Sequence, residues 1–407
     1  MNFLVGENST GKSSVLALLK LMSTPQFWNN DDFNIVDLEL GSFSELLTTK
    51  PLDGKKEFQL GFHIDDDLEE RARFTNTFLA TYKNEQGSPR LTSIRLFIDS
   101  LNILIELRDS QMKVFIKEVK YLISEPEKFK YWIEDSNFKS IPSTIYGRDR
   151  NGINLFYEIR NALRNTLPSS IKISGALRPE FLPFPTWIAP IRSKPKRIYE
   201  SFKLIFSPEG DHTPLLIKHI LSNKFKKNIS KEAFAKALQK FGSASGLFDK
   251  IEIKNLGKEE SSPFHLNIFL NKSPIRITNV GYGVGQVLPV LTEILVSFSG
   301  NWFSVQQPEV HLHPKAQAAL GAFFFEATKK QKYFLVETHS DFLIDRYRLC
   351  LKQNSHSISS QVLFFERTKN GNKVTGISID KSGQYSENQP NSFRSFFINE
   401  ELDLLSL

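Results

Sequence analysis

The chain has 407 residues, 52 Lys and Arg against 45 Asp and Glu, and a net charge of +7. With 40% apolar residues it is not globally disordered, and its length fits a large core with an inserted lobe. The single cysteine, Cys350, excludes an intramolecular disulfide, and no apolar run approaches the roughly 20 residues that cross a bilayer. We therefore expect a cytoplasmic protein without a secretory leader or membrane anchor.

The N-terminal half changes its hydrophobic period along the chain. Phe3 to Val5 predicts a strand, residues 6–14 a loop, and Val15 to Met22 a helix. From Phe58 to Glu118 apolar residues alternate, which predicts antiparallel strands and hairpins. Helical spacing returns between Pro126 and Leu167. A β-rich and helical insertion therefore follows the first strand and helix.

The C-terminal half returns to strand and helix in turn. We predict an extended connector at Pro179–Pro195, helices at Ser230–Phe241, Val287–Phe298 and Pro314–Lys330, and strands at Phe264–Leu270, Trp302–Val305 and Tyr333–Val336. Such alternation at both ends predicts an α/β core, a mixed sheet flanked by helices, split by a long insertion. We expect residues 1–120 to hold half of this core and a β lobe, 121–250 a mainly helical insert, and 251–407 the other half.

One motif near the N-terminus carries specific chemistry. Residues 6–13 fit the phosphate-loop pattern G-x-x-x-x-G-K-[ST] between the predicted strand and helix. In such loops main-chain N–H groups wrap phosphates, the lysine neutralises phosphate oxygens, and the hydroxyl after it binds Mg²⁺. We expect ATP and Mg²⁺ to be bound here by Gly6, Glu7, Asn8, Ser9, Thr10, Gly11, Lys12, Ser13 and Ser14.

Three weaker motifs follow in the C-terminal half. Gly281, Gly283 and Gly285 alternate just before a predicted helix, where free N–H groups form an anion site. Residues 306–314, QQPEVHLHP, follow a core strand, and His339 lies at the tip of the next strand. The histidines in that run have no Cys partner and no H-E-x-x-H spacing, so a zinc site is disfavoured.

Taken in order, these pieces resemble the ATP-binding cassette class of P-loop ATPases. They are most similar to the branch with structural-maintenance-of-chromosomes (SMC) proteins, overcoming-lysogenization-defect nucleases and bacterial AAA family ATPases, many of them from phage-defence operons. The resemblance is carried by residues 6–13, 189–192, 195–199, 209–210, 281–290, 307–314, 337–341 and 379–383.

The resemblance implies a fold and a mode of action. It implies a core of the ATP-binding cassette type with an antiparallel β lobe, and a homodimer in which two protomers sandwich ATP head to tail. Gly283, Gly285 and Gln286 would then act across the interface on the nucleotide of the partner. His339 would contact the γ-phosphate.

The sequence departs from the family at its acidic pair. Gln306 stands where the family has the carboxylate that holds the Mg²⁺ shell, and Gln307 stands where it has the carboxylate that polarises water. An amide can orient water but does not accept a proton as a carboxylate does, and Glu309 is the nearest substitute. We expect slow hydrolysis, with ATP serving mainly to clamp the dimer; a scaffold that never hydrolyses ATP remains an alternative.

Two kinds of partner remain open. Only 68 residues follow His339, fewer than a domain of about 100 residues needs, so we expect any effector, such as an HNH or Toprim nuclease of Septu or retron type, to be a separate chain. The alternative is a DNA-repair ATPase. Segment 188–240 has 12 Lys and Arg against 4 Asp and Glu, and its candidate phosphate contacts are Arg192, Lys194, Lys196, Arg197, Lys224, Lys226 and Lys227. A solvated basic face explains the lysines around Lys224 equally well.

Overall fold

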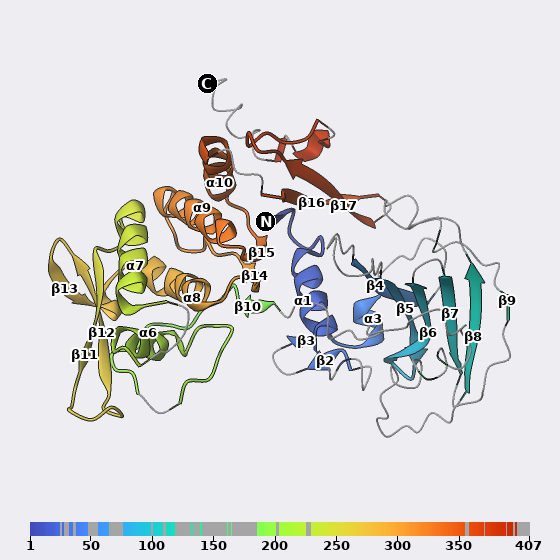
Figure 1. Ribbon diagram of the computed structural model, residues 1–407, viewed down its shortest axis with the longest axis horizontal. Helices are drawn as coiled ribbons and strands as arrows, with labels where there is room; N and C mark the ends of the chain where they lie inside the picture. The colour runs from blue at the N-terminus through green and yellow to red at the C-terminus, as the bar shows by residue number, and fades with distance from the viewer. Residues whose placement is uncertain are drawn as a thin grey trace. The chain divides into compact units, whose positions relative to one another are not determined.

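Two compact units make up the chain in the computed structural model of Figure 1. The core unit joins Met1–Lys20 to Pro183–Leu407, and the inserted unit is Leu21–Leu182. The structure describes the chain except residues 25–26, 28–31, 36–37, 48–55, 65–75, 99–100, 109–110, 119–131, 133–138, 141–160, 162–163, 165–184, 201–202, 225–228, 355–357, 370, 388, 394 and 397–407. No helix within the described residues has the length and apolar character of a membrane span.

A six-stranded sheet is the frame of the core unit. Its order is β10 (Thr186–Ile188), β14 (Trp302–Gln306), β15 (Tyr333–Glu337), β1 (Asn2–Gly6), β16 (Ser360–Thr368) and β17 (Gly371–Ile379). The first five are parallel and β17 is antiparallel to β16. The carboxyl ends of β14, β15 and β1 therefore meet at one edge, which is where open α/β sheets bind ligands.

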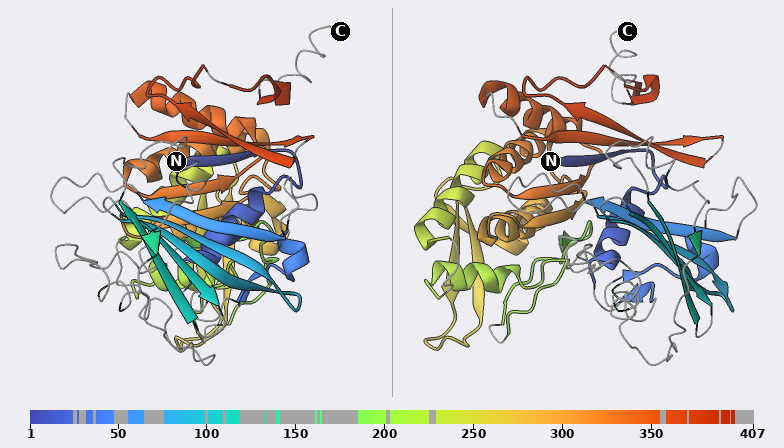
Figure 2. Two further views of the ribbon diagram at one scale, coloured as in Figure 1. Left: turned by 90° about the vertical axis from the view of Figure 1, so that its right-hand side faces the viewer. Right: turned by 45° about the vertical axis from the view of Figure 1, so that its right-hand side comes forward.

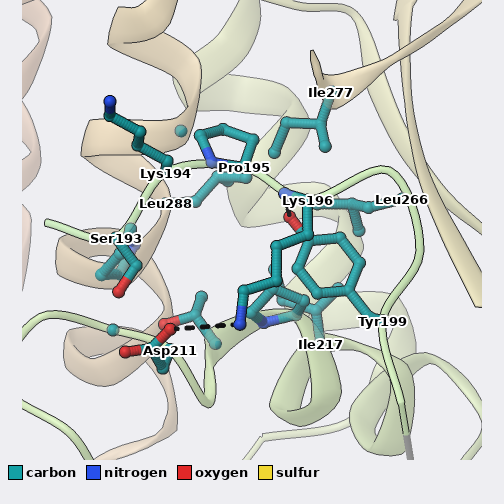
Figure 3. A pocket seen from close by; sticks show the side chains of 15 residues that line it. Ser193, Lys194, Pro195, Lys196, Tyr199, Asp211, Ile217, Leu266, Ile277 and Leu288 are labelled. Atoms are coloured by element: carbon teal, nitrogen blue, oxygen red, sulfur yellow. Dashed lines mark hydrogen bonds and ion pairs between the residues drawn. The ribbon is translucent and has the colours of Figure 1, made fainter.

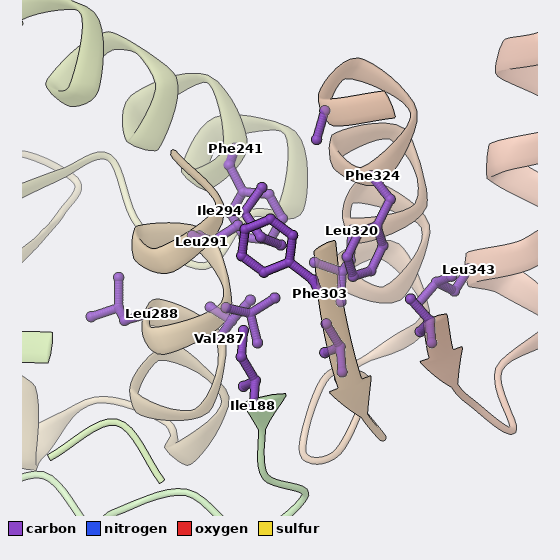
Figure 4. Packing of buried hydrophobic residues seen from close by; sticks show 14 of the residues in the cluster. Ile188, Phe241, Val287, Leu288, Leu291, Ile294, Phe303, Leu320, Phe324 and Leu343 are labelled. Atoms are coloured by element: carbon purple, nitrogen blue, oxygen red, sulfur yellow. The ribbon is translucent and has the colours of Figure 1, made fainter. Parts of the chain in front are cut away.

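Alternate residues of these strands bury on opposite faces of the sheet. Phe3 and Val5 join Phe303 and Val336 in the large hydrophobic core, part of which Figure 4 shows. Leu4, between them, packs instead in a small cluster with Leu16 and Phe365. The two-residue period of a strand produces this division. It also places Gln306 and Glu337, each next to a residue of the large core, on the Leu4 face.

Helices cover both faces of the sheet in the core unit. Helices α8 (Tyr282–Val296), α9 (Pro314–Lys329) and α10 (Asp341–Asn354) lie against the large core, and α1 (Lys12–Met22) lies on the other face (Figure 1). A second, antiparallel sheet is made by β11 (Lys250–Asn255), β12 (Phe264–Leu270) and β13 (Ser273–Arg276), with α6 (Thr213–Leu221), α7 (Lys231–Ser245) and the short η2 (Ile277–Asn279) beside it.

The inserted unit is a meander whose strands pair in chain order, as Figure 2 shows for its long strands. It comprises β4 (Glu57–Ile64), β5 (Asn76–Glu85), β6 (Ser88–Ile98), β7 (Leu101–Arg108), β8 (Gln111–Glu118) and β9 (Lys139–Ser140), with a hairpin of β2 (Asn34–Ile35) and β3 (Leu38–Glu39) and helix α3 (Phe43–Leu46). Tyr82 stacks on Phe58 at 5.4 Å between ring centroids and meets Phe33 edge-on at 5.0 Å. Aromatic packing of this kind holds the meander to its N-terminal segment.

The predicted fold class, a mixed α/β core with an antiparallel β lobe, is confirmed by these sheets. Helix α7 runs four residues past the predicted Phe241, until Gly246 ends it with a left-handed φ of 76°. Helix α8 begins at Tyr282, five residues before the predicted Val287, because Gly283 and Gly285, which we expected before the helix, lie inside it. The predicted helical pattern at Pro126–Leu167 falls largely outside the described residues.

The chain leaves the core unit after Lys20 and returns to it after Leu182. This division differs from the boundaries that we expected at residues 120 and 250. Helices α6 and α7 lie in the segment expected to form the insert. Their side chains Leu216, Leu238 and Phe241 are nevertheless buried in the same core as α8. Burial of shared apolar surface therefore joins residues 213–245 to the core unit.

Candidate ATP-binding site

The phosphate loop connects β1 to α1 through left-handed backbone. Gly6 and Gly11 have φ of 139° and 102°, and Ser9 has φ of 61°. The Thr10 hydroxyl donates a hydrogen bond of 2.7 Å to the carbonyl oxygen of Glu7 and closes the turn. A Cβ on Gly11 would meet no atom within 4 Å, so the loop is open on that side. Such a loop ahead of a helix N-terminus suits an anion.

Lys12 lies over this loop with its ammonium group turned inward. The residue is 4% exposed, and Nζ donates to the carbonyl oxygens of Gly6 at 2.8 Å and Glu7 at 2.6 Å. Burial lowers the pKa of Lys12, while the carboxylates of Glu337 and Glu7 oppose that shift. The sequence therefore places a desolvated positive charge where phosphate oxygens would enter the loop.

Gln306 and Glu337 end two neighbouring strands side by side. They are partners in the register of β14 and β15, and both lie on the sheet face covered by α1. The Gln306 amide nitrogen donates to Oε2 of Glu337 at 3.0 Å. On α1, the Ser13 Oγ lies 2.9 Å from both carboxylate oxygens of Glu337. A hydroxyl, an amide and a carboxylate thus converge beside the phosphate loop.

Trp187 and Arg192 fix Gln306 from the other side. The indole Nε1 of Trp187 donates to Oε1 of Gln306 at 2.8 Å, and the Lys20 ammonium lies 4.1 Å from the Trp187 ring centroid. Arg192 is 3% exposed, and its guanidinium donates to the main-chain oxygen of Gln306 at 2.9 Å. Trp187 lies in β10 and Arg192 just after it, so β10 and the segment that follows it organise the end of β14.

Gln307 and Glu309, the two candidates for activating water, have different surroundings. Gln307 is partly exposed, with φ of 40°, and its N–H donates to the main-chain oxygen of Glu337 at 2.8 Å. Glu309 is buried, and its Oε1 accepts the main-chain N–H of His339 at 2.7 Å. Burial raises the pKa of Glu309, against the effects of this hydrogen bond and of Arg192. In this geometry Glu309 holds the His339 loop.

His339 follows β15 and is exposed at the same edge of the sheet. Partial desolvation of the ring lowers the pKa of His339, the nearby Lys12 ammonium lowers it further, and Glu337 raises it. The ring is therefore neutral at pH 7 and can donate from one nitrogen while accepting at the other. Its place two residues after β15, with its main-chain N–H held by Glu309, puts it at the sheet edge where β14 and β15 end.

A family model described as an AAA ATPase domain matches residues 1–344, which include the phosphate loop, both strand ends and His339. The chain belongs to the AAA ATPase domain family. No curated protein matches it. Chemistry at the site and family membership therefore agree that this chain is an ATPase of the AAA type.

Solved structures similar to this AAA ATPase include SMC head domains. An SMC head bound to the C-terminal winged-helix domain of ScpA has 12% identity and a TM-score of 0.37, covering 94% of this chain and 91% of that chain. The SMC head domain from Thermotoga maritima has 10% identity and a TM-score of 0.32, covering 92% and 89%. One with an extended coiled coil, bound to the C-terminal domain of ScpA derived from Pyrococcus furiosus, has 12% identity and a TM-score of 0.35, covering 99% and 93%.

The glycine-rich run of the ATPase lies in the first turn of α8. A Cβ on Gly283 would lie 2.7 Å from the main-chain oxygen of His311, and one on Gly285 would lie 2.7 Å from Cγ of Pro195. Gln286 is 2% exposed and its amide donates to the Arg192 oxygen at 3.3 Å. These three residues pack α8 within its own protomer. Their expected contact with the nucleotide of a partner stays a prediction.

The basic segment of the ATPase is partly neutralised by its own chain. Lys196 pairs with Asp211 at 3.8 Å beside the small pocket of Figure 3, and Lys224 pairs with Glu260 at 2.7 Å. Arg192 is buried beneath β14, so it does not present its charge to DNA. Lys194 and Arg197 are exposed, and residues 225–228, with Lys226 and Lys227, lie outside the described residues.

The histidines after β14 have structural partners. His313 caps α9 by accepting the N–H of Ala316, and the His311 ring meets Tyr282 edge-on at 5.2 Å. Among the described residues, no group of three His, Cys, Asp or Glu side chains is arranged to hold a metal. Both histidines therefore have partners within the core unit.

Sequence reasoning missed Glu337 and Trp187 as members of the site. Glu337 was visible only as the neighbour of His339, since nothing in a linear motif shows that β14 and β15 are paired in register. The available signal was the residue type at the two strand ends: Gln306 ends β14 and is followed by Gln307, whereas Glu337 ends β15.

Proposed function

We propose that this chain binds MgATP at residues 6–14, closes into a homodimer around it, and hydrolyses it slowly. The observation that carries the proposal is the convergence of Lys12, Ser13 and Glu337 at the carboxyl edge of the parallel sheet. This is the edge where α/β folds bind nucleotides.

The residues present fit ATP with its metal. Lys12 holds a buried charge above an open glycine loop, and releasing its two carbonyl contacts would free the ammonium for phosphate oxygens. Ser13 has its hydroxyl beside a carboxylate, the oxygen chemistry that Mg²⁺ prefers when phosphates complete its shell. When bound, Mg²⁺ neutralises charge on the phosphates. Ser13 would hold it and Lys12 would orient the γ-phosphate.

Slow hydrolysis follows from the residues available as a base near the ends of β14 and β15. Proton acceptance from water needs a base within hydrogen-bond reach, and the residue directly after β14 is the amide Gln307. The carboxylate of Glu309 is buried against the His339 N–H, and that of Glu337 faces Ser13 and Gln306. His339 and Gln307 are left to orient water or phosphate. ATP therefore stays uncleaved after the dimer has closed, and it holds the two protomers together.

The biological role we propose rests on the resemblance to bacterial AAA family ATPases. The dimer would be a cytoplasmic sensor or scaffold controlling a separate effector, such as an HNH or Toprim nuclease, in defence against phage. The runs 281–290, 307–314 and 337–341 support this assignment. Exposed Tyr282 at the start of α8 is available to contact a partner chain.

Restoring a carboxylate at position 307 tests the hydrolysis part of the proposal. In Gln307→Glu we expect single-turnover ATP hydrolysis to rise at least about tenfold, because a positioned general base contributes roughly 10² to 10⁴ in rate. Affinity for ATP should change little. Radiolabelled phosphate release with enzyme in excess over ATP measures the step directly.

Gln331→Glu is the matched control, since Gln331 is also a non-glycine residue with a left-handed φ, 56°, and lies in the turn before β15. Its hydrolysis rate should equal that of the parent. If Gln307→Glu and a Gln306→Glu/Gln307→Glu double variant both hydrolyse no faster than the parent, the missing base is not what limits turnover.

A further inference from the structure

The carboxylate beside the phosphate loop stands on a different strand from the one the family pattern uses. We propose that Glu337, at the end of β15, is the acidic ligand of the nucleotide-bound Mg²⁺, and that Gln306 does not bind this ion. The inference rests on the proposed ATP binding and assigns its metal shell to a residue outside the acidic pair.

Sheet geometry makes such a relocation possible. Gln306 and Glu337 are direct register partners on adjacent parallel strands, and their side chains point to the same face, toward α1. Neighbouring strands lie only about 4.8 Å apart, so a carboxylate can be moved from one strand to the next and still reach the same ion. A carboxylate can then reach the same ion from β15, although the acidic residue is missing from the family's position on β14.

The hydrogen bonds of Gln306 show which end of its amide faces the site. Its Nε2 donates to Glu337 Oε2, while its Oε1 accepts the Trp187 indole N–H. The indole N–H is only a donor, so it fixes the amide oxygen toward Trp187. An NH₂ group repels a cation, so Gln306 supports the carboxylate and leaves ligation to Glu337.

Ser13 links Glu337 to the phosphate loop. Its Oγ is 2.9 Å from each oxygen of Glu337, and the hydroxyl after the loop lysine is the protein group that binds Mg²⁺ in phosphate loops. Glu337 is 5% exposed, so its charge needs compensation from Ser13, Gln306 and the nearby Lys12. A divalent ion bound here would compensate the rest of the buried negative charge of Glu337.

The metal dependence of ATP binding tests this assignment without relying on turnover. We would titrate ATP by calorimetry into the parent and into Glu337→Gln, with Mg²⁺ in excess and again in EDTA. In the parent, Mg²⁺ should tighten ATP binding. In Glu337→Gln this gain should shrink about tenfold or more, while affinity in EDTA stays equal or rises, because a negative charge beside the phosphates is lost. Mn²⁺ electron paramagnetic resonance should show weaker retention of the ion with ATP bound.

A charge swap guards against a purely structural effect. Gln306→Glu/Glu337→Gln keeps one carboxylate and one amide and returns the carboxylate to β14. We expect it to recover most of the Mg²⁺-dependent affinity that Glu337→Gln loses, and circular dichroism should show both variants folded.

Two results would overturn the inference. One is an unchanged Mg²⁺ gain in Glu337→Gln, and the other is an equal loss of affinity with Mg²⁺ and in EDTA, which would make Glu337 a support of the loop only. If the parent binds no ATP under either condition, the proposed function itself fails, so the two failures are distinguishable.

Discussion

Replacing Lys12 by alanine is expected to weaken ATP binding by about 100-fold or more. The ammonium is buried over the loop and can turn from two carbonyl oxygens to phosphate oxygens, and hydrogen bonds to charged groups contribute roughly 1.5–3 kcal/mol each. Losing two of them gives a change of this order. The change should be similar with Mg²⁺ and in EDTA, because Lys12 acts on the phosphates directly. Calorimetric titration with ATP measures it.

Lys258→Ala is the control for Lys12→Ala, since Lys258 is exposed in the β11–β12 connection of the same unit. Its affinity for ATP should match that of the parent. Lys12→Ala should unfold near the parental midpoint without nucleotide, because removing a buried ammonium relieves its desolvation cost while two hydrogen bonds are lost. Parental ATP affinity in Lys12→Ala would place the nucleotide elsewhere.

Gly6→Ala is expected to damage both the fold and the site. Gly6 has a φ of 139°, a conformation that other residues rarely adopt, and a Cβ there would overlap the Phe365 carbonyl oxygen on β16. Backbone strain of about 1–3 kcal/mol adds to an overpacking cost of similar size, so we expect about 2–6 kcal/mol less stability. Separation of β1 from β16 at this point would also move the loop, and ATP binding should be lost. Urea unfolding and ATP titration measure the two effects.

Gly300→Ala separates strain from overlap in this comparison. Gly300 also has a positive φ, 86°, but a Cβ there meets no atom within 4 Å. It should cost about 1–3 kcal/mol of stability and leave ATP binding intact. Equal destabilisation by the two substitutions would show that contact with β16 does not account for the glycine at position 6.

The core and the phosphate loop could be predicted because their signals are local. Hydrophobic spacing marks β1 and α1, and the residues from Gly6 to Ser13 form one continuous motif. The start of α8 was missed because glycine normally weakens a helix, and here Gly283 and Gly285 are retained where His311 and Pro195 approach too closely for a side chain.

The carboxylate of the site could not be found in the same way. Gln306 and Glu337 are 31 residues apart, and only the register of β14 with β15 makes them neighbours. The roles of Trp187 and Arg192 likewise depend on β10 and the segment after it, more than 110 residues before the Gln306 atoms they bind. The role of Glu309 as a substitute base stays a prediction, and its Oε1 accepts the His339 N–H.

Sedimentation velocity in saturating MgATP tests most directly whether ATP serves here as a clamp. We expect a monomer without nucleotide, a dimer with MgATP that persists for as long as bound ATP remains uncleaved, and a dimer of much shorter lifetime in Gln307→Glu, because faster hydrolysis releases it. Lys12→Ala should stay monomeric. A parent protein that remains a monomer in MgATP, or a dimer with the same lifetime in Gln307→Glu despite faster hydrolysis, would contradict the clamp.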